Sequence, residues 1–372
     1  MAAEELAKAG HKVLVAEAKP SVGRKLLMAG KSGLNLTKDE PFEQFMCAYD
    51  EAAEHLRPML AEFGPAQVQD WAQDLGQPIF TGSSGRVFPK AMKASPLLRA
   101  WLARLAGMGV EFRTRWRWTG WQDTALCFET PDGAVQLSPK VTILALGGAS
   151  WSRLGSDGAW ADWIGLPITP FAPANAGLQV NWSDHMQRHF GSPIKGVQLA
   201  AGDATSRGEF VISARGLEGG GIYSVSKAIR QGAQLTLDLT PDQKLQTLTE
   251  RLSRPRGKAT LTNHLRKTLR LTPAQIALLQ EFARPLATGA ALARLIKSLP
   301  IKHNGLRPLD EAISTAGGLP FVAMDNTLQL SARPNTYAVG EMLDWEAPTG
   351  GYLLTACLST GRWAGKHAAL RL

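Results

Sequence analysis

Apolar residues at both ends of the chain follow the spacing of helices and buried strands. Residues 1–9 place Glu4 and Lys8 four positions apart, which favours a helix, and Gly10 is placed to end it. Residues 12–17 (KVLVAE) and 140–150 (KVTILALGGAS) are short apolar runs with β-branched side chains, which predict buried strands. Because helices alternate with such strands, the pattern predicts an α/β fold built on an open parallel sheet.

The middle of the chain has a different pattern of apolar positions. Short alternating runs at residues 176–182, 198–201, 209–213 and 234–239 predict strands, and residues 241–300 repeat leucine at helical spacing. We therefore expect a β-barrel-like insert and a helical insert within a split α/β domain. The expected boundaries are residues 1–165 and 311–372 for the split domain, 166–240 for the β insert and 241–310 for the helical insert.

Composition narrows the classes of protein further. The 372 residues carry a net charge of +9, but the positive charge is dispersed, and the densest stretch, 251–267, is typical of a solvated helical face. The chain has no apolar run of 18 residues, and residues 1–20 do not resemble a signal peptide. We therefore expect a cytoplasmic protein that binds a small-molecule substrate, with neither a nucleic acid nor a membrane as its partner.

Cysteine and histidine positions argue against a metal centre. The three cysteines, Cys47, Cys127 and Cys357, are far apart in sequence and form no C-x-x-C motif, which favours a reducing compartment. His185 and His189 are four apart, but no third ligand accompanies them. The sequence predicts no metal site.

Glu17 ends an apolar run that follows a helix, as does the acid that binds ribose hydroxyls in a dinucleotide fold. In that fold a glycine loop precedes the acid by about 20 residues. The spacing places this loop before Met1, so the first strand and the glycine loop are expected to be missing from residues 1–372. A strand in the centre of the sheet would then be absent, and its neighbours would lack ladder partners. On this motif alone, an ordinary strand with a solvated terminal acid is an open alternative.

Five segments in order along the chain resemble one family. They are SVGRKLLMAGKSGLNLTK (21–38), SSGRVFPKAMKASPLLRAW (83–101), LALGGAS (144–150), TAGG (315–318) and AVGEMLDWEAPTGGYLLTACLSTGRWAG (338–365). Together they resemble the BaiN/RdsA-like flavoproteins, which are described as aminoacetone-oxidase-like or NAD(P)/FAD-dependent oxidoreductases. The resemblance covers nearly the whole chain. It implies a Rossmann-like FAD-binding domain with inserted β-barrel and helical domains.

The resemblance also implies which residues hold FAD. Glu17 would bind the adenosine ribose, and Trp118 would lie where a strand contacts adenine. The remaining residues would flank the ribose, pyrophosphate, ribitol and flavin: Gly23, Arg24, Lys25, Gly30, Lys31, Ser32, Gly33, Asn35, Gly147, Gly148, Gly340, Glu341, Gly350, Gly351 and Tyr352. The helix after Tyr352 would direct its N-terminus at the flavin.

The sequence departs from the family pattern in three places. The first glycine loop is absent, Leu146 replaces a threonine found in many relatives, and residues 353–355 (LLT) replace Asn-Leu-Gln. These differences indicate a subgroup whose substrate differs.

The expected reaction is hydride transfer between FAD and a small organic substrate, with NAD(P)H as a possible reductant. The sequence identifies no side chain as the catalytic acid or base. Tyr352 and Arg215 are the candidates for the substrate side of the flavin. A truncated, inactive remnant or a binding module is the alternative, because the glycine loop is missing.

Overall fold

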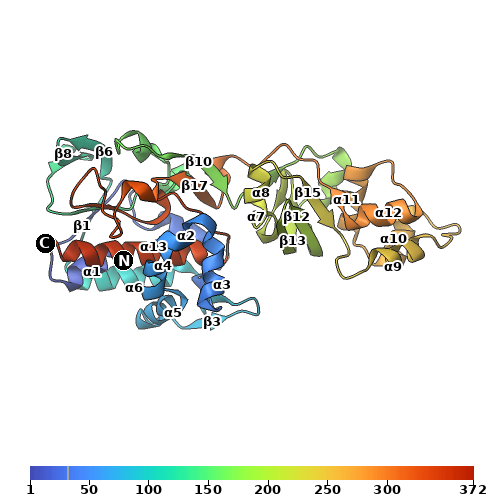
Figure 1. Cartoon of the computed structure of the whole chain (residues 1–372), viewed down its shortest axis with the longest axis horizontal. Coiled ribbons are helices and arrows are strands. Elements are labelled where there is room, and N and C mark those ends of the chain that lie inside the picture. Colours follow the sequence, from blue (N-terminus) through green and yellow to red (C-terminus); the bar gives the residue numbers. More distant parts are fainter. Residues whose placement is uncertain (32) are drawn as a thin grey trace. The chain divides into compact units, whose positions relative to one another are not determined.

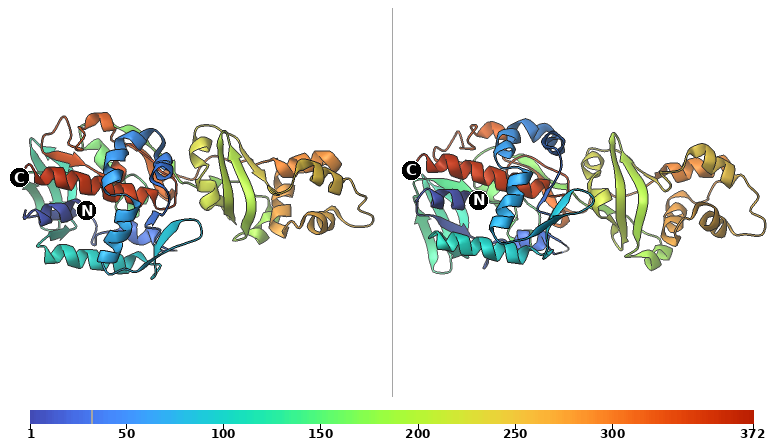
Figure 2. Two further views of the ribbon diagram at one scale, coloured as in Figure 1. Left: turned by 60° about the horizontal axis from the view of Figure 1, so that its bottom comes forward. Right: turned by 90° about the horizontal axis from the view of Figure 1, so that it is seen from below.

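The computed structural model describes residues 1–31 and 33–372. The chain forms two compact units (Figures 1 and 2). Unit 1 comprises residues 1–172 and 314–372, and unit 2 comprises residues 173–313. Unit 2 is thus an insertion within the sequence of unit 1, and each unit is described below by itself.

Unit 1 is a mixed α/β structure. Its helices are α1 (Ala2–Lys8), α2 (Arg24–Ala29), α3 (Phe42–Met46), α4 (Ala53–Glu62), α5 (Pro65–Asp74), α6 (Ala94–Gly107) and α13 (Tyr352–Ala369). Its strands are β1 (Leu14–Glu17), β2 (Thr37–Lys38), β3 (Ile79–Thr81), β4 (Arg86–Pro89), β5 (Glu111–Thr114), β6 (Arg117–Gln122), β7 (Ala125–Thr130), β8 (Gly133–Leu137), β9 (Thr142–Leu144), β17 (Ser314–Gly318) and β18 (Thr336–Ala338). Strand β10 (Thr169–Ala174) runs across the boundary between the units.

The parallel strands of unit 1 form two pairs. In one pair β1 lies beside β5, with Glu17 opposite Thr114. In the other β18 lies beside β9, with Ala338 opposite Leu144. Within the described residues β1 and β9 belong to separate sheets. The expected α/β architecture with parallel strands is confirmed.

Helix α13 runs alongside α1 in unit 1 (Figure 1). Two glycines of α13 allow the close approach: a Cβ on Gly361 would lie 3.4 Å from the Cβ of Met1, and one on Gly365 would lie 2.7 Å from the Cα of Ala2. Small residues spaced four apart let two helix backbones pack closely, here in a soluble core. This packing fixes the C-terminal helix against the start of the chain.

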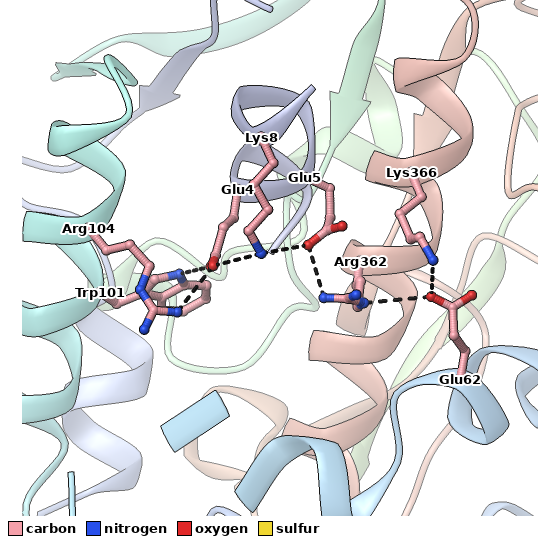
Figure 3. A network of polar contacts seen from close by, with 8 residues as sticks. All are labelled: Glu4, Glu5, Lys8, Glu62, Trp101, Arg104, Arg362 and Lys366. Atoms are coloured by element: carbon pink, nitrogen blue, oxygen red, sulfur yellow. Dashed lines mark hydrogen bonds and ion pairs between the residues drawn. The ribbon is translucent and has the colours of Figure 1, made fainter. Parts of the chain in front are cut away.

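A network of charged side chains ties four helices of unit 1 together (Figure 3). Glu4 of α1 is 1% exposed, and its carboxylate accepts from Trp101 Nε1 at 2.9 Å and from Arg104 at 3.3 Å, both on α6. Arg362 of α13 pairs with Glu5 of α1 at 3.0 Å and with Glu62 of α4 at 3.6 Å. The network therefore holds α1, α4, α6 and α13 in one arrangement.

Unit 2 contains a six-stranded sheet in the order β11-β14-β13-β12-β15-β16. The strands are β11 (Leu178–Gln179), β12 (Pro193–Ala201), β13 (Ala204–Ser213), β14 (Gly216–Glu218), β15 (Leu235–Asp238) and β16 (Leu299–Pro300). Gln179 of the edge strand β11 exchanges backbone hydrogen bonds with Asn304 and Gly305, which follow β16 closely in the chain. The stretch 299–305 thus pairs with both edges of the sheet and gives it a barrel-like closure.

Helices of unit 2 lie on two sides of this sheet. They are α7 (Gly220–Tyr223), α8 (Ser226–Arg230), α9 (Leu245–Leu252), α10 (Leu261–Leu269), α11 (Pro273–Ala283) and α12 (Gly289–Lys297). Helices α9 to α12 group on one side and α7 and α8 on the other (Figures 1 and 2). One apolar core, which includes Leu199, Phe210, Leu278 and Ile296, joins the sheet to the helices. No helix in the described part of the chain is long and apolar enough to cross a bilayer.

Candidate functional site

A buried polar cluster joins residues that are far apart in the sequence. Lys25 lies at the start of α2, and its Nζ donates to Glu341 Oε2 at 2.6 Å, to Ser150 Oγ at 2.9 Å and to Ser156 Oγ at 3.3 Å. Glu341 follows β18 and is only 8% exposed, while Ser150 follows β9. The ends of the parallel strands β9 and β18 therefore bring Glu341 and Ser150 to the same ammonium group. In open α/β sheets ligands bind beyond such strand ends.

The other oxygen of Glu341 is held by the backbone. Glu341 Oε1 accepts from the Thr315 N–H at 3.1 Å, and the Thr315 hydroxyl accepts from the Ala149 N–H at 2.9 Å. A Cβ on Gly148 would lie 2.6 Å from the Thr315 Cβ and 3.3 Å from the Glu341 carboxyl carbon. Only glycine fits at Gly148, so the loop after β9 can approach the cluster with its bare backbone.

Glu17 lies at the end of β1, as the sequence predicts. Its Oε1 accepts from the Lys19 N–H at 2.8 Å, and burial raises the pKa of the Glu17 carboxyl. The backbone carbonyl of Glu17 accepts from the Trp116 N–H at 3.0 Å, which brings β6 and its Trp118 close to the strand end. Glu17 and Trp118 thus lie in neighbouring elements of unit 1.

The segment around α2 contains eight of the expected cofactor residues, seven of which the structure describes. Gly23 precedes the helix in a left-handed conformation (φ 69°), where glycine is favoured. Arg24 and Lys25 open the helix, and Gly30 ends it against Ala94. Lys31, Gly33 and Asn35 follow in irregular backbone, and Ser32 lies outside the described residues.

Three buried polar atoms at expected cofactor residues have no hydrogen-bond partner among the residues that the structure describes. They are Arg24 Nε, Asn35 Oδ1 and Trp118 Nε1. Leaving such a group unsatisfied costs about 1–3 kcal/mol. Polar groups of a bound molecule would supply the missing partners, so these residues fit a cofactor rich in polar atoms, as FAD is.

The N-terminus of α13 is preceded by Gly350 and Gly351, both at positive φ (136° and 98°). A Cβ on Gly351 would lie 2.5 Å from the Thr37 Cα, and the Thr355 hydroxyl donates to the Thr37 hydroxyl at 2.8 Å. Tyr352, the first residue of α13, contacts Lys38 through its hydroxyl. The helix terminus is therefore fixed on β2.

Arg215 is the other residue that the sequence suggests for the substrate side. It lies in unit 2, in the turn between β13 and β14, and its guanidinium makes two 2.7 Å hydrogen bonds to the Glu311 carboxylate. Among the residues that the structure describes, no group of three His, Cys, Asp or Glu side chains could hold a metal ion.

Sequence reasoning missed several polar residues of the site. Ser150 and Thr315 lie inside two segments that carry the family resemblance, so the segments indicated their positions but not their roles. Lys38 ends the segment 21–38, which also carries the resemblance, whereas Ser156 and Glu40 carry no motif of their own. Their contacts depend on long-range folding, because Ser156 is 131 positions from Lys25, and Lys38 and Glu40 are 314 and 312 positions from Tyr352.

Lys25→Met should destabilise unit 1 by about 2 kcal/mol, because it leaves the buried Glu341 carboxylate without its cation. Adding Glu341→Gln should recover part of that loss, since an amide needs no counter-ion. Urea denaturation of both single variants and the double variant measures the coupling energy. Additive losses would show that the two side chains do not interact.

Comparison with known proteins agrees with this geometry. The family model described as the HI0933-like protein Rossmann domain matches residues 1–367. The 3-dehydro-bile acid delta(4,6)-reductase of Clostridium scindens is 25% identical over 405 aligned positions, which cover 96% of this chain and 93% of that protein.

Two solved structures are similar over nearly the whole chain. The 3-ketosteroid delta1-dehydrogenase of Sterolibacterium denitrificans, solved with 1,4-androstadiene-3,17-dione, has a TM-score of 0.50 and 13% identity, covering 99% of this chain and 97% of that one. The E. coli quinol fumarate reductase subunit FrdA has a TM-score of 0.48 and 15% identity, covering 100% of this chain and 68% of that one. The similarity to the 3-ketosteroid delta1-dehydrogenase concerns the fold alone. With its family model spanning residues 1–367, the chain belongs to the HI0933-like Rossmann-domain family of FAD-dependent oxidoreductases.

Proposed function

We propose that this protein binds FAD in unit 1 and transfers hydride between the flavin and a small organic substrate. The observation that carries the proposal is the cluster in which Lys25, Glu341 and Ser150 converge at the ends of two parallel strands. The buried atoms of Arg24, Asn35 and Trp118 that lack a hydrogen-bond partner within residues 1–31 and 33–372 support it. When bound, FAD supplies the hydride chemistry of its flavin ring.

Different residues of unit 1 would bind different parts of FAD. Glu17 accepts hydrogen bonds from the adenosine ribose, and Arg24 and Lys25 offset the charge of the pyrophosphate. Glu341 would accept hydrogen bonds from the ribitol hydroxyls of FAD. The N-terminus of α13, after Gly351, stabilises negative charge on the flavin.

The substrate and the reductant are proposed by analogy with relatives. The relative named as a 3-dehydro-bile acid delta(4,6)-reductase makes a keto-steroid with conjugated double bonds the first substrate class to test. NADH and NADPH are the reductants to compare. A small molecule, and neither a nucleic acid nor a membrane, is the proposed partner.

Purified protein should show flavin absorbance, with about one FAD released per chain on denaturation. A folded protein that remains colourless after incubation with FAD would contradict the proposal and favour a binding module without redox activity. NADH and NADPH are then added to the flavin-loaded protein without air, and bleaching of the flavin identifies the reductant.

Glu17→Gln should weaken FAD binding about 10- to 100-fold, because hydrogen bonds to a charged acceptor contribute about 1.5–3 kcal/mol. Affinity should also fall as the pH drops through the raised pKa of Glu17, since the protonated carboxyl accepts less well. Flavin fluorescence titration measures both effects.

Glu111→Gln on the adjacent strand β5 is the matched control, because Glu111 is exposed and pairs with Arg113. Its FAD affinity should equal that of the natural protein at every pH. Equal weakening by both substitutions would place the ribose away from Glu17.

A further inference from the structure

The Tyr352 hydroxyl bridges an acid and a base. Lys38 Nζ donates to the Tyr352 hydroxyl oxygen at 2.9 Å, and this hydroxyl donates to Glu40 Oε1 at 2.6 Å. Lys38 and Glu40 also form an ion pair of 2.7 Å. The three side chains therefore form a closed set in which the direction of each hydrogen bond is defined.

Local backbone geometry explains why both charged groups reach one hydroxyl. Lys38 ends β2 and Glu40 is two residues further on, so in extended chain their side chains point to the same face. Gly351 packs its backbone on Thr37, which fixes the first turn of α13 at the end of β2. Tyr352 is thereby held over that face.

Of these three side chains, Lys38 is the most exposed to solvent. Tyr352 is 7% exposed and the Glu40 side chain is 7% exposed, whereas the Lys38 side chain is 24% exposed. An ammonium group with partial access to solvent can exchange protons with water, while the phenol and the carboxylate are shielded. The arrangement thus leads from solvent through Lys38 to the Tyr352 hydroxyl.

We propose that Lys38, Tyr352 and Glu40 form a proton relay in which Tyr352 protonates the substrate and Lys38 reprotonates Tyr352. This inference rests on the proposed function, which places the N-terminus of α13 at the flavin. Tyr352 is the catalytic residue of the relay. Lys38 and Glu40 are positioning residues, because they act through the Tyr352 hydroxyl.

The step balances in atoms and electrons. Reduced FAD, when bound, would supply a hydride, with both electrons, to one carbon of a conjugated double bond of the substrate. The Tyr352 O–H bond breaks as its proton bonds to the substrate atom that then carries negative charge. An N–H proton of Lys38 passes to the phenolate oxygen, the Lys38 amine takes a proton from water, and Glu40 remains a carboxylate throughout.

The pKa values of the two proton donors shift in the same direction. Burial raises the pKa of Tyr352, and the Glu40 carboxylate raises it further while Lys38 lowers it. Burial lowers the pKa of Lys38, but its hydrogen bonds to Glu40 and Tyr352 raise it overall.

Two other titratable groups lie near Tyr352. Tyr49 donates its hydroxyl to the Tyr352 backbone carbonyl at 2.8 Å, and burial raises the pKa of Tyr49 well above its usual value. Arg86 of β4 lies beside Gly350, with its Nε 3.8 Å from where a Cβ on that glycine would be. Tyr49 also packs edge-on against the Tyr352 ring, with 6.2 Å between the ring centroids, and a phenylalanine keeps this ring contact. Tyr49→Phe is therefore the matched control.

The first test needs no cofactor. The chain contains four tyrosines, so tyrosine labelled with ¹³C at Cζ gives four signals, and Tyr352→Phe identifies the one from Tyr352. We expect its titration midpoint to rise by about one pH unit in Lys38→Met and to fall by about one pH unit in Glu40→Gln. Tyr49→Phe should leave it unchanged. The relay is overturned if the midpoint stays unchanged in both Lys38→Met and Glu40→Gln. It is also overturned if the midpoint shifts by the same amount in Tyr49→Phe.

The second test uses flavin-loaded protein that has been reduced without air. Tyr352→Phe should slow reoxidation by 1,4-androstadiene-3,17-dione about 100-fold, because that acceptor needs a proton. Reoxidation by ferricyanide needs no proton and should change less than about twofold, since general-acid catalysis has no role there. The relay is overturned if the steroid reoxidises Tyr352→Phe as fast as the natural protein. It is also overturned if Tyr352→Phe is slowed equally with the steroid and with ferricyanide.

The two tests separate the relay from the proposed function. Failure to bind FAD, or to react with the steroid in the natural protein, counts against the proposed cofactor or substrate class. The ¹³C titration then decides the relay by itself. The three remaining tyrosine signals report whether each variant is folded.

Discussion

Gly351→Ala should destabilise unit 1 by about 4 kcal/mol and abolish the packing of α13 on β2. A Cβ at this position would lie 2.5, 2.6 and 2.7 Å from the Cα, C and N atoms of Thr37. These are backbone atoms of a strand, so they cannot rotate away as a side chain could. The left-handed backbone (φ 98°) adds about 1–2 kcal/mol for any residue with a Cβ, and overpacking adds about 1–3 kcal/mol.

Urea denaturation followed by tryptophan fluorescence measures this loss. Gly76→Ala is the matched control, since Gly76 also has positive φ (71°) but a Cβ there would meet no atom within 4 Å. The control should lose only the backbone contribution, about 1–2 kcal/mol. Equal losses in the two variants would mean that the contact with Thr37 does not constrain α13.

Glu4→Ala should destabilise unit 1 by about 3 kcal/mol, which is the second largest effect that we expect. Its buried carboxylate accepts from Trp101 and Arg104 and pairs with Lys8 at 3.2 Å (Figure 3). Removing one partner of a buried charged network leaves the other groups without compensation. Thermal denaturation should show a clearly lower Tm.

Glu43→Ala is the control for a charged pair at the surface. Glu43 makes two hydrogen bonds to Arg57, at 2.8 and 3.0 Å, but its side chain is 75% exposed. Solvent screens exposed pairs, so the Tm of this variant should stay close to that of the natural protein. A loss as large as that of Glu4→Ala would show that burial does not decide the effect.

The contribution of Glu4 should depend on pH. Burial by itself raises the pKa of Glu4, but the ammonium of Lys8 and the hydrogen bonds from Lys8 and Trp101 lower it below its ordinary value of 4.5. A lowered pKa in the folded state gives stability that is present above the unfolded value and is lost as the pH falls through the folded value. The difference between the natural protein and Glu4→Gln should therefore shrink in acid.

Local patterns predicted the elements of this fold better than they predicted its contacts. The apolar run at 12–17 contains β1 (Leu14–Glu17), and the helical spacing at 241–300 contains α9 to α12. These predictions needed only neighbouring residues, because strand and helix periods are local. The family resemblance then added the roles of Lys25 and Glu341 as cofactor residues, which stay predictions.

The contacts of the site could not be predicted from spacing. Tyr352 meets Lys38 and Glu40 across more than 300 positions, and nothing near either segment marks the partner. The approach depends on Gly351, whose missing side chain lets α13 reach Thr37. A glycine pair before a helix indicates a tight turn, but it does not say which strand the turn will touch.

Unit 2 begins and ends at adjacent positions, because the N–H of Ile313 donates to the carbonyl of Asn175 at 3.3 Å. It also has an apolar core of its own. A segment with neighbouring ends can be excised and replaced by a short turn without rerouting the remaining chain. Residues 173–313 can therefore be treated as one exchangeable segment, and exchanging it among family members would be a route to new proteins that keep the expected cofactor residues of unit 1.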